Sequence, residues 1–181
     1  MMKVTSYLKQ SLTILLFITG ISLVTISACK DQDEEASPVV TGPEAGKIAA
    51  DFTLLDADNI ERSLSDYRGQ LVVLHFWASW CSYCKAENPN LVALNNAYKH
   101  KGLKVLAVSL DTDRNKWLTG ISIENLDFDH VSDFKGFDSP IVEMFDVGSI
   151  PFMFLIDENG VIIEISNRTI DVAAKVEQHY Q

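Results

Sequence analysis

The hydrophobic and polar positions change their period along this chain, and these changes predict its elements. Residues 71–77, Leu-Val-Val-Leu-His-Phe-Trp, form an almost continuous apolar run, which is typical of a strand buried on both faces. A second apolar run at 103–110 predicts another buried strand. Between them, apolar residues recur at three- and four-residue spacing, so a helix is expected from Cys81 to Lys99, kinked by Pro89.

The second half of the chain predicts smaller elements. Ser139–Pro140 has the cap and the first residue of a short helix. Asn159–Gly160 predicts a hairpin turn with a return strand at 162–165, and an amphipathic helix is expected over 171–179. Residues 121–136 show no period, so we expect them to be irregular. This order of strands and helices predicts an α/β domain.

Two cysteines, Cys81 and Cys84, stand where the first predicted strand passes into the helix. A helix N-terminus carries free N–H groups and partial positive charge, which stabilise the thiolate, the reactive form of cysteine. At this spacing on a first turn, the pair can close and open a disulfide without rebuilding the backbone. The pattern therefore predicts redox chemistry.

A zinc site is the first alternative for such a pair. A structural zinc site needs four ligands and usually a second cysteine pair, which this chain lacks. Its histidines are scattered and form no H-x-x-x-H motif; they are His75, His100, His130 and His179. No metal site is therefore predicted. A static disulfide is the second alternative, although a strand-to-helix corner is where redox pairs lie.

The composition fits one globular domain. Of the 181 residues, 47% are hydrophobic, which is ordinary for a chain with a full core. The formal net charge is −10, which disfavours nucleic acids and anionic membrane surfaces as partners.

The N-terminus has the order of an export signal. Lys3 and Lys9 precede an apolar stretch that ends in Ile26-Ser27-Ala28-Cys29. This ending resembles a bacterial lipobox, which implies a signal peptide over 1–28 and a lipid on Cys29; an uncleaved membrane anchor is the alternative. Residues 29–45 are acidic and contain two prolines, as in a disordered spacer, so the folded domain is expected over 46–181.

The segment from Phe76 to Cys84 resembles the active site of the thioredoxin superfamily. With Glu87 and Pro89 it reads Trp-Cys-x-x-Cys-x-x-Glu-x-Pro, which is similar to membrane-tethered thiol–disulfide oxidoreductases of the TlpA/ResA type. The resemblance extends from about Gly46 to the C-terminus. It implies a thioredoxin-like three-layer α/β/α sandwich with a central mixed sheet and an added N-terminal hairpin.

A second stretch, from Phe145 to Pro151, resembles the "aromatic-x-Val-x-x-Ile-Pro" signature of the same superfamily. The resemblance implies that Pro151 is a cis-proline beside the disulfide and that Ile150 offers its backbone to an extended substrate. Phe152 departs from the threonine that the family commonly has there. The implied substrate-binding residues are Trp80, Ser82, Tyr83, Ile150, Pro151 and Phe152.

Two further residues gain a possible role from the resemblance. Thioredoxins have a buried aspartate where this chain has His75, which implies proton transfer at the second cysteine; the alternative is a histidine of the core. Glu87 matches the glutamate with which TlpA/ResA-type proteins tune their cysteines; the alternative is a solvated helix residue.

The resemblance implies an extracytoplasmic thiol–disulfide oxidoreductase, acting as a reductase, with the Cys81–Cys84 disulfide as its redox group and no further cofactor. Cys81 is expected to be the exposed nucleophile and Cys84 the buried resolving thiol. The partners would be protein disulfides, in cytochrome c maturation or envelope redox homeostasis, and a membrane electron donor of the DsbD/CcdA kind.

Two other functions stay open. A thiol peroxidase of the AhpC/TSA type would share the core, but Leu74 and Ala78 stand where its motif has proline and threonine or serine. A non-catalytic or copper-carrying module of the Sco type would use Cys-x-x-x-Cys with a distant histidine, for which His130 is the candidate; here two residues separate the cysteines.

Overall fold

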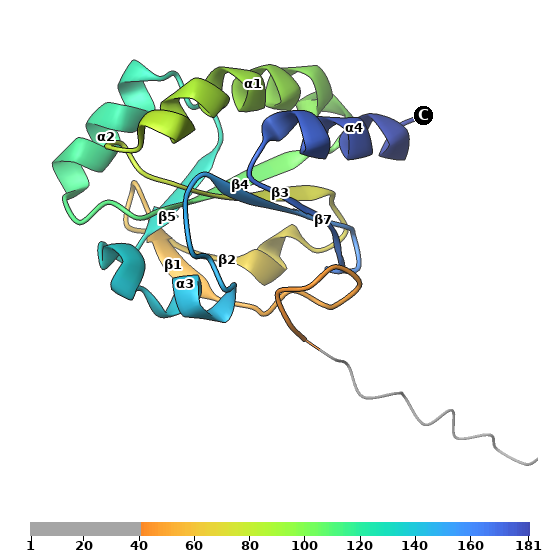
Figure 1. Ribbon diagram of the computed structural model, residues 1–181, viewed down its shortest axis with the longest axis horizontal. Helices are drawn as coiled ribbons and strands as arrows, with labels where there is room; N and C mark the ends of the chain where they lie inside the picture. The colour runs from red at the N-terminus through yellow and green to blue at the C-terminus, as the bar shows by residue number, and fades with distance from the viewer. Residues whose placement is uncertain (1–40) are drawn as a thin grey trace, which may run out of the picture. The chain divides into compact units, whose positions relative to one another are not determined.

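The computed structural model of the protein describes residues 41–181 (Figure 1). The predicted signal peptide, Cys29 and most of the acidic spacer lie outside the described residues. The strands are β1 (Thr53–Asp56), β2 (Glu61–Ser63), β3 (Val72–Trp77), β4 (Lys104–Ser109), β5 (Asp129–Ser132), β6 (Phe152–Ile156) and β7 (Ile162–Ser166). The α-helices are α1 (Ser82–Tyr98), α2 (Arg114–Ile123), α3 (Pro140–Met144) and α4 (Thr169–His179).

The strands form a mixed sheet in the order β2-β1-β5-β4-β3-β6-β7. β3 is parallel to β4 and antiparallel to β6, and β4 is parallel to β5. The predicted N-terminal hairpin is confirmed, because β1 and β2 are antiparallel and β1 extends the sheet beyond β5. The redox motif therefore follows an interior strand of an open sheet.

The expectation that residues 121–136 are irregular is wrong. α2 continues to Ile123, and Asp129–Ser132 forms β5 between β4 and β1. This strand is too short and polar to give an apolar run, since it includes Asp129 and His130. Its pairing with two neighbouring strands, rather than its own sequence, holds it in the sheet.

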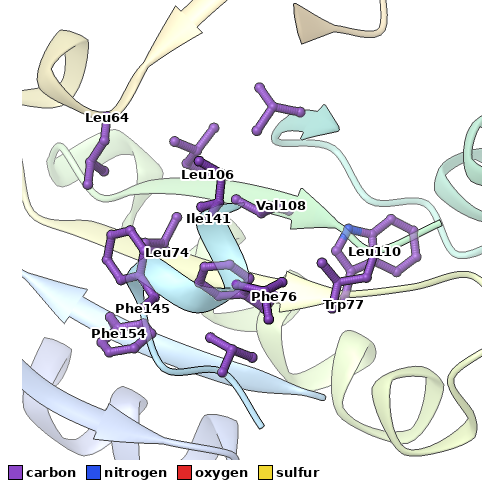
Figure 2. Packing of buried hydrophobic residues seen from close by; sticks show 14 of the residues in the cluster. Leu64, Leu74, Phe76, Trp77, Leu106, Val108, Leu110, Ile141, Phe145 and Phe154 are labelled. Carbon is purple, nitrogen blue, oxygen red and sulfur yellow. The ribbon is translucent and has the colours of Figure 1, made fainter. Parts of the chain in front are cut away.

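All six residues of β3 are buried, and their alternation divides them between two cores. Leu74 and Phe76 face a cluster with Phe145 and Phe154, which Figure 2 shows. Val73 faces the opposite cluster, which includes side chains from α1 and α4. This double burial explains why β3 reads as a continuous apolar run.

Helices cover both faces of the sheet. α1 and α4 lie side by side over one face, and α3 lies on the other (Figure 1). α1 buries a stripe at helical spacing, made by Cys84, Asn88, Leu91, Leu94 and Asn95. Within 41–181, no helix combines the length and the apolar character that crossing a membrane requires.

The chain joins the sheet at the end that lies opposite to the cysteines. Ile48 bridges to Val161, and the N–H of Ala49 donates to the carbonyl of Gly160 at 2.9 Å, both beside the turn between β6 and β7. This turn follows Ile156, which pairs with Val72 at the start of β3. Cys81 follows the other end of β3.

Candidate active site

Cys81 and Cys84 form a disulfide at the N-terminus of α1, with their Cα atoms 5.2 Å apart. Cys81 is the cap residue of this helix, and the backbone N–H of Cys84 donates to its Sγ at 3.0 Å. The predicted helix and its start are thus confirmed. In the reduced protein, the same N–H group and the helix dipole would stabilise a thiolate on Cys81.

The expectation that Cys81 is exposed is wrong for the disulfide form. Its exposed fraction is 6%, against 0% for Cys84. The Sγ of Cys81 lies 3.6 Å from the carbonyl oxygen of Ile150, which covers it. Its neighbours Trp80 and Tyr83 are 56% and 76% exposed. Cys81 is therefore almost completely buried, next in sequence to the exposed Trp80 and close to the exposed Tyr83.

The loop before Cys81 is held by hydrogen bonds to the buried side chain of Asp111. Asp111 accepts hydrogen bonds from the N–H and the Oγ–H of Ser79 at 2.9 and 2.7 Å, and from Ser109 at 2.8 Å. Gly120 of α2 packs against this loop so closely that a Cβ there would lie 2.7 Å from the Cβ of Ser79. Asp111 and Gly120 thus hold Ser79, two residues before Cys81.

The Ile150–Pro151 bond is cis, as the resemblance implied. It borders a groove of about 370 Å³, lined by Tyr83, Ala86, Glu87, Ser149, Ile150, Pro151, Asn167 and Arg168. Ser82 is exposed at the first turn of α1. The ring of Phe152 is half-buried and packs 5.3 Å from that of Phe154, so it belongs to the core beside the site. That these residues bind substrate stays a prediction.

Glu87 lies between the groove and α4. Its Oε2 accepts a hydrogen bond from the backbone N–H of Thr169 at 2.8 Å. Burial raises the pKa of Glu87, but the hydrogen bonds from Thr169 and Asn90 and the charge of Arg168 together outweigh it, so the pKa lies below its ordinary value. Glu87 therefore lines the groove as a carboxylate.

His75 lies on the α1 face of β3 and is 1% exposed. Burial lowers its pKa to about 4, although the Asn88 side chain, the Phe152 backbone and the charge of Glu87 act to raise it. Across 41–181, neither of its ring nitrogens completes a hydrogen bond. His75 is thus a neutral imidazole under the active-site helix, as a proton acceptor would require.

Two residues beside the site were missed from the sequence. Asn88 is buried one turn after Cys84, and its polar side chain within an apolar stripe was an available signal. Phe137 is 47% exposed, and its ring lies 6.5 Å from that of Trp80. No sequence signal pointed to Phe137, because it comes from the stretch after β5.

Metal binding gains no support from the described chain, where no group of three or more candidate ligands occurs. His130 is 5% exposed and packs between the rings of Phe128 and Trp77, at 4.8 and 5.5 Å. Its Nε2 lies 3.2 Å from the carbonyl oxygen of Leu126. The histidine named for copper is therefore part of the core.

Comparisons with known proteins agree with this geometry. Residues 45–165 match the model of the AhpC/TSA family. The thiol-disulfide oxidoreductase ResA of Geobacillus kaustophilus is 33% identical over 147 residues, which are 78% of this chain and 79% of that protein.

Solved structures give the same result. The thioredoxin domain of a thiol-disulfide oxidoreductase from Bacteroides vulgatus has a TM-score of 0.72 and 28% identity, covering 76% of this chain and 99% of that one. A thiol-disulfide oxidoreductase from Bacteroides fragilis has a TM-score of 0.70 and 31% identity, covering 74% and 99%. The expected thioredoxin-like fold is confirmed. The chain therefore belongs to the AhpC/TSA family within the thioredoxin superfamily, as a thiol–disulfide oxidoreductase of the TlpA/ResA type.

Proposed function

We propose that this oxidoreductase works outside the cytoplasm, tethered by a lipid on Cys29, and reduces disulfides of other proteins. The observation that carries this proposal is the Cys81–Cys84 disulfide at the N-terminus of α1, with the backbone of Ile150 beside it. Such a backbone can pair with an extended polypeptide, which brings a substrate disulfide to Cys81.

The reaction would proceed in two exchanges. The Cys81 thiolate attacks one substrate sulfur; a Cys81–substrate bond forms, the substrate disulfide breaks, and the departing sulfur keeps the electron pair and takes a proton. Cys84 then attacks Cys81, the Cys81–substrate bond breaks, and the second substrate sulfur leaves as a thiol. Two electrons have moved from the cysteine pair to the substrate, and the pair is oxidised.

A membrane electron donor of the DsbD/CcdA kind would then reduce the Cys81–Cys84 disulfide. The tether is supported by the sequence before Cys29, which has the charge, apolar core and small residues of an export signal. Apo-cytochrome c and other envelope proteins are the substrate class that this placement favours. Globomycin treatment and metabolic labelling with a palmitate analogue would test the lipid; a Cys29→Ser chain that still incorporates label would refute it.

The direction of transfer is tested by the equilibrium reduction potential of the Cys81–Cys84 pair. A value near about −270 mV supports a reductase, whereas a value near about −120 mV would identify an oxidant. The roles are tested by trapping. A Cys84→Ser chain should accumulate a mixed disulfide on Cys81, and continued turnover by that chain would overturn the assignment.

A thiol peroxidase is the second candidate, because the matching family model carries the name AhpC/TSA. Leu74 and Ala78 are apolar and buried, so neither supplies a hydroxyl to a peroxide at Cys81. Peroxide consumption coupled to a thiol donor, measured beside reduction of a protein disulfide, separates the two activities.

A further inference from the structure

Two aromatic side chains near the disulfide are exposed and are not explained by the packing of the fold. Trp80 is 56% exposed and Phe137 is 47% exposed. Their ring centroids lie 6.5 Å apart, with the ring planes tilted by 49°. Within the described chain, neither ring belongs to the two core clusters or packs against them. Exposed apolar groups that lie together, rather than singly, mark interaction sites.

The loop after β5 divides its two phenylalanines between the core and the surface. Phe134 packs against the ring of Trp117, with the centroids 5.4 Å apart, and its N–H donates to the Oγ of Ser132 at 3.1 Å. Phe137, in contrast, lies beside Trp80 and outside the core. Phe134 thus makes the core contact of this loop, and packing within the fold does not account for Phe137.

Phe137 stands on a backbone that is fixed on both sides. Before it, Gly136 has a φ of 62°, and a Cβ on Gly136 would lie 3.3 Å from the Cγ2 of Thr112. After it, Ser139 is buried, and its Oγ accepts a hydrogen bond at 3.3 Å from the N–H of Ile141 in α3. An aromatic side chain on a rigid backbone provides contact area at a low cost in conformational entropy.

Any disulfide with which this oxidoreductase reacts must bring a sulfur atom to Cys81, the residue after Trp80. In a mixed disulfide the two Cα atoms lie about 5.5 Å apart, and an extended chain advances about 3.3 Å per residue. A side chain one or two residues from the substrate cysteine therefore reaches Trp80 and, next to it, Phe137. The molecule that covers the aromatic pair is thus the substrate itself.

The aromatic pair and the groove beside Pro151 are separate, because neither ring lines that groove. The backbone of Ile150 can pair with any extended segment and so selects no side chain. We propose that Phe137, together with Trp80, binds a large apolar side chain of the substrate, within two residues of the cysteine that Cys81 attacks. Phe137 is then a specificity-determining residue. The preferred substrates are disulfides in unfolded or extended segments, since folded proteins bury most such side chains.

The inference rests on the proposed reduction of protein disulfides, and its test uses one half-reaction of that function. The probes are short peptides whose single cysteine forms a mixed disulfide with thionitrobenzoate. The Cys81 thiolate of the reduced protein attacks the peptide sulfur; the Cys81–peptide bond forms, the peptide–thionitrobenzoate bond breaks, and thionitrobenzoate leaves with the electron pair. Stopped-flow absorbance gives the rate constant of this release, and a Cys81→Ala chain gives the background to subtract.

Three peptides separate a local contact from general hydrophobicity. The first has phenylalanine directly before and after the cysteine, and the second has alanine at both places. The third has the same composition as the first, but its phenylalanines are five residues away from the cysteine. We expect the wild type to react with the first peptide about fivefold faster than with either of the others, as an aromatic contact would cause.

Variants of the protein test whether Phe137 is the source of this preference. Phe137→Ala should reduce it to about twofold or less, whereas Phe137→Tyr should keep it, because tyrosine retains the ring. Ile60→Ala is the matched control, since Ile60 is 56% exposed and lies between β1 and β2. This control should keep the full preference. Thermal unfolding of each variant shows that it is folded.

The outcomes distinguish this inference from the reductase function. Equal rate constants for the first and third peptides in the wild type would overturn the inference without any variant. A full preference in Phe137→Ala, or an equal loss of preference in Ile60→Ala, would also overturn it. A wild type that prefers the first peptide but reduces no protein disulfide would refute the reductase function and leave the apolar site standing.

Discussion

Glu87 of the active-site helix accepts a hydrogen bond from the backbone N–H of Thr169, the first residue of α4, at 2.8 Å. In the described chain, the cap residue Arg168 gives α4 no side-chain hydrogen bond. Glu87 thus supplies from another helix the acceptor that an N-terminus needs, and its charge complements the helix dipole. One carboxylate joins the groove beside Pro151 to the last helix.

Replacing Glu87 by alanine should therefore destabilise the fold. We expect a loss of about 1 kcal/mol in the free energy of unfolding at neutral pH, from the lost cap. Because the folded pKa of Glu87 is lowered, its contribution is present above the unfolded value of about 4.5 and lost as pH falls through the folded pKa. Urea denaturation across pH measures this, with the exposed Glu177→Gln of α4 as control. Equal stability of Glu87→Ala and wild type would contradict the capping role.

The two buried histidines should make the protein sensitive to acid. Burial lowers the pKa of His75 to about 4 and that of His130 to about 3, from 6.5. Between these values and 6.5, the unfolded chain binds protons that the folded chain excludes, so stability falls as pH falls. Each histidine should contribute about 1 kcal/mol per pH unit in this window.

His130→Phe tests this acid sensitivity, because phenylalanine keeps the ring between Phe128 and Trp77 without a titrating group. The slope of unfolding free energy against pH, measured by denaturant titration, should fall by about half below pH 6.5. An unchanged slope would mean that other groups cause the acid sensitivity.

Gly120→Ala should displace the loop that carries Cys81. Its new Cβ would lie 2.7 Å from that of Ser79, on a part of the loop that Asp111 holds. We expect a destabilisation of about 1–3 kcal/mol and a slower attack by Cys81. Thermal unfolding measures the loss of stability. Stopped-flow reaction of the reduced protein with Ellman's reagent measures the attack by Cys81, because that attack releases the first thionitrobenzoate. Gly148→Ala is the control, because nothing lies within 4 Å of a Cβ there; a similar loss in it would argue against the contact with Ser79.

Phe137→Ala should weaken the binding of protein substrates. Phe137 and Trp80 form an exposed aromatic pair beside the cysteines, and exposed aromatic side chains commonly bind polypeptides. With an unfolded disulfide protein, KM should rise about fivefold or more with little change in kcat, as expected for a lost contact of about 1 kcal/mol. The rate of reaction with Ellman's reagent should stay unchanged, because this small disulfide has no polypeptide chain to contact Phe137. Ile123→Ala, at an exposed residue of α2, serves as the control, and an equal rise in KM there would remove the special role of Phe137.

Local patterns predicted the core of the site. The apolar run before Cys81, the helical spacing after it and the turn at Asn159–Gly160 each depend on residues close in sequence, and the structure has the expected elements there. The resemblance added the cis bond before Pro151. These features were accessible because neighbouring residues determine them.

What was missed depends on contacts between distant segments. β5 exists because Leu106–Val108 and β1 flank it, which its own four residues do not reveal. The orientation of the Asn88 amide depends on Glu124, 36 residues later on α2. The Sγ of Cys81 contacts the carbonyl oxygen of Ile150, which is 69 residues away in the sequence. A single sequence carries no signal for such pairings.

The bridge of Ile48 to Val161 determines how far the entry of the chain into the sheet lies from the disulfide. It brings the chain into the sheet where β3 begins, whereas Cys81 follows the other end of that strand. A strand of six residues spans about 20 Å. The place where the described chain enters the sheet and the disulfide therefore lie at opposite ends of β3, about 20 Å apart along the strand.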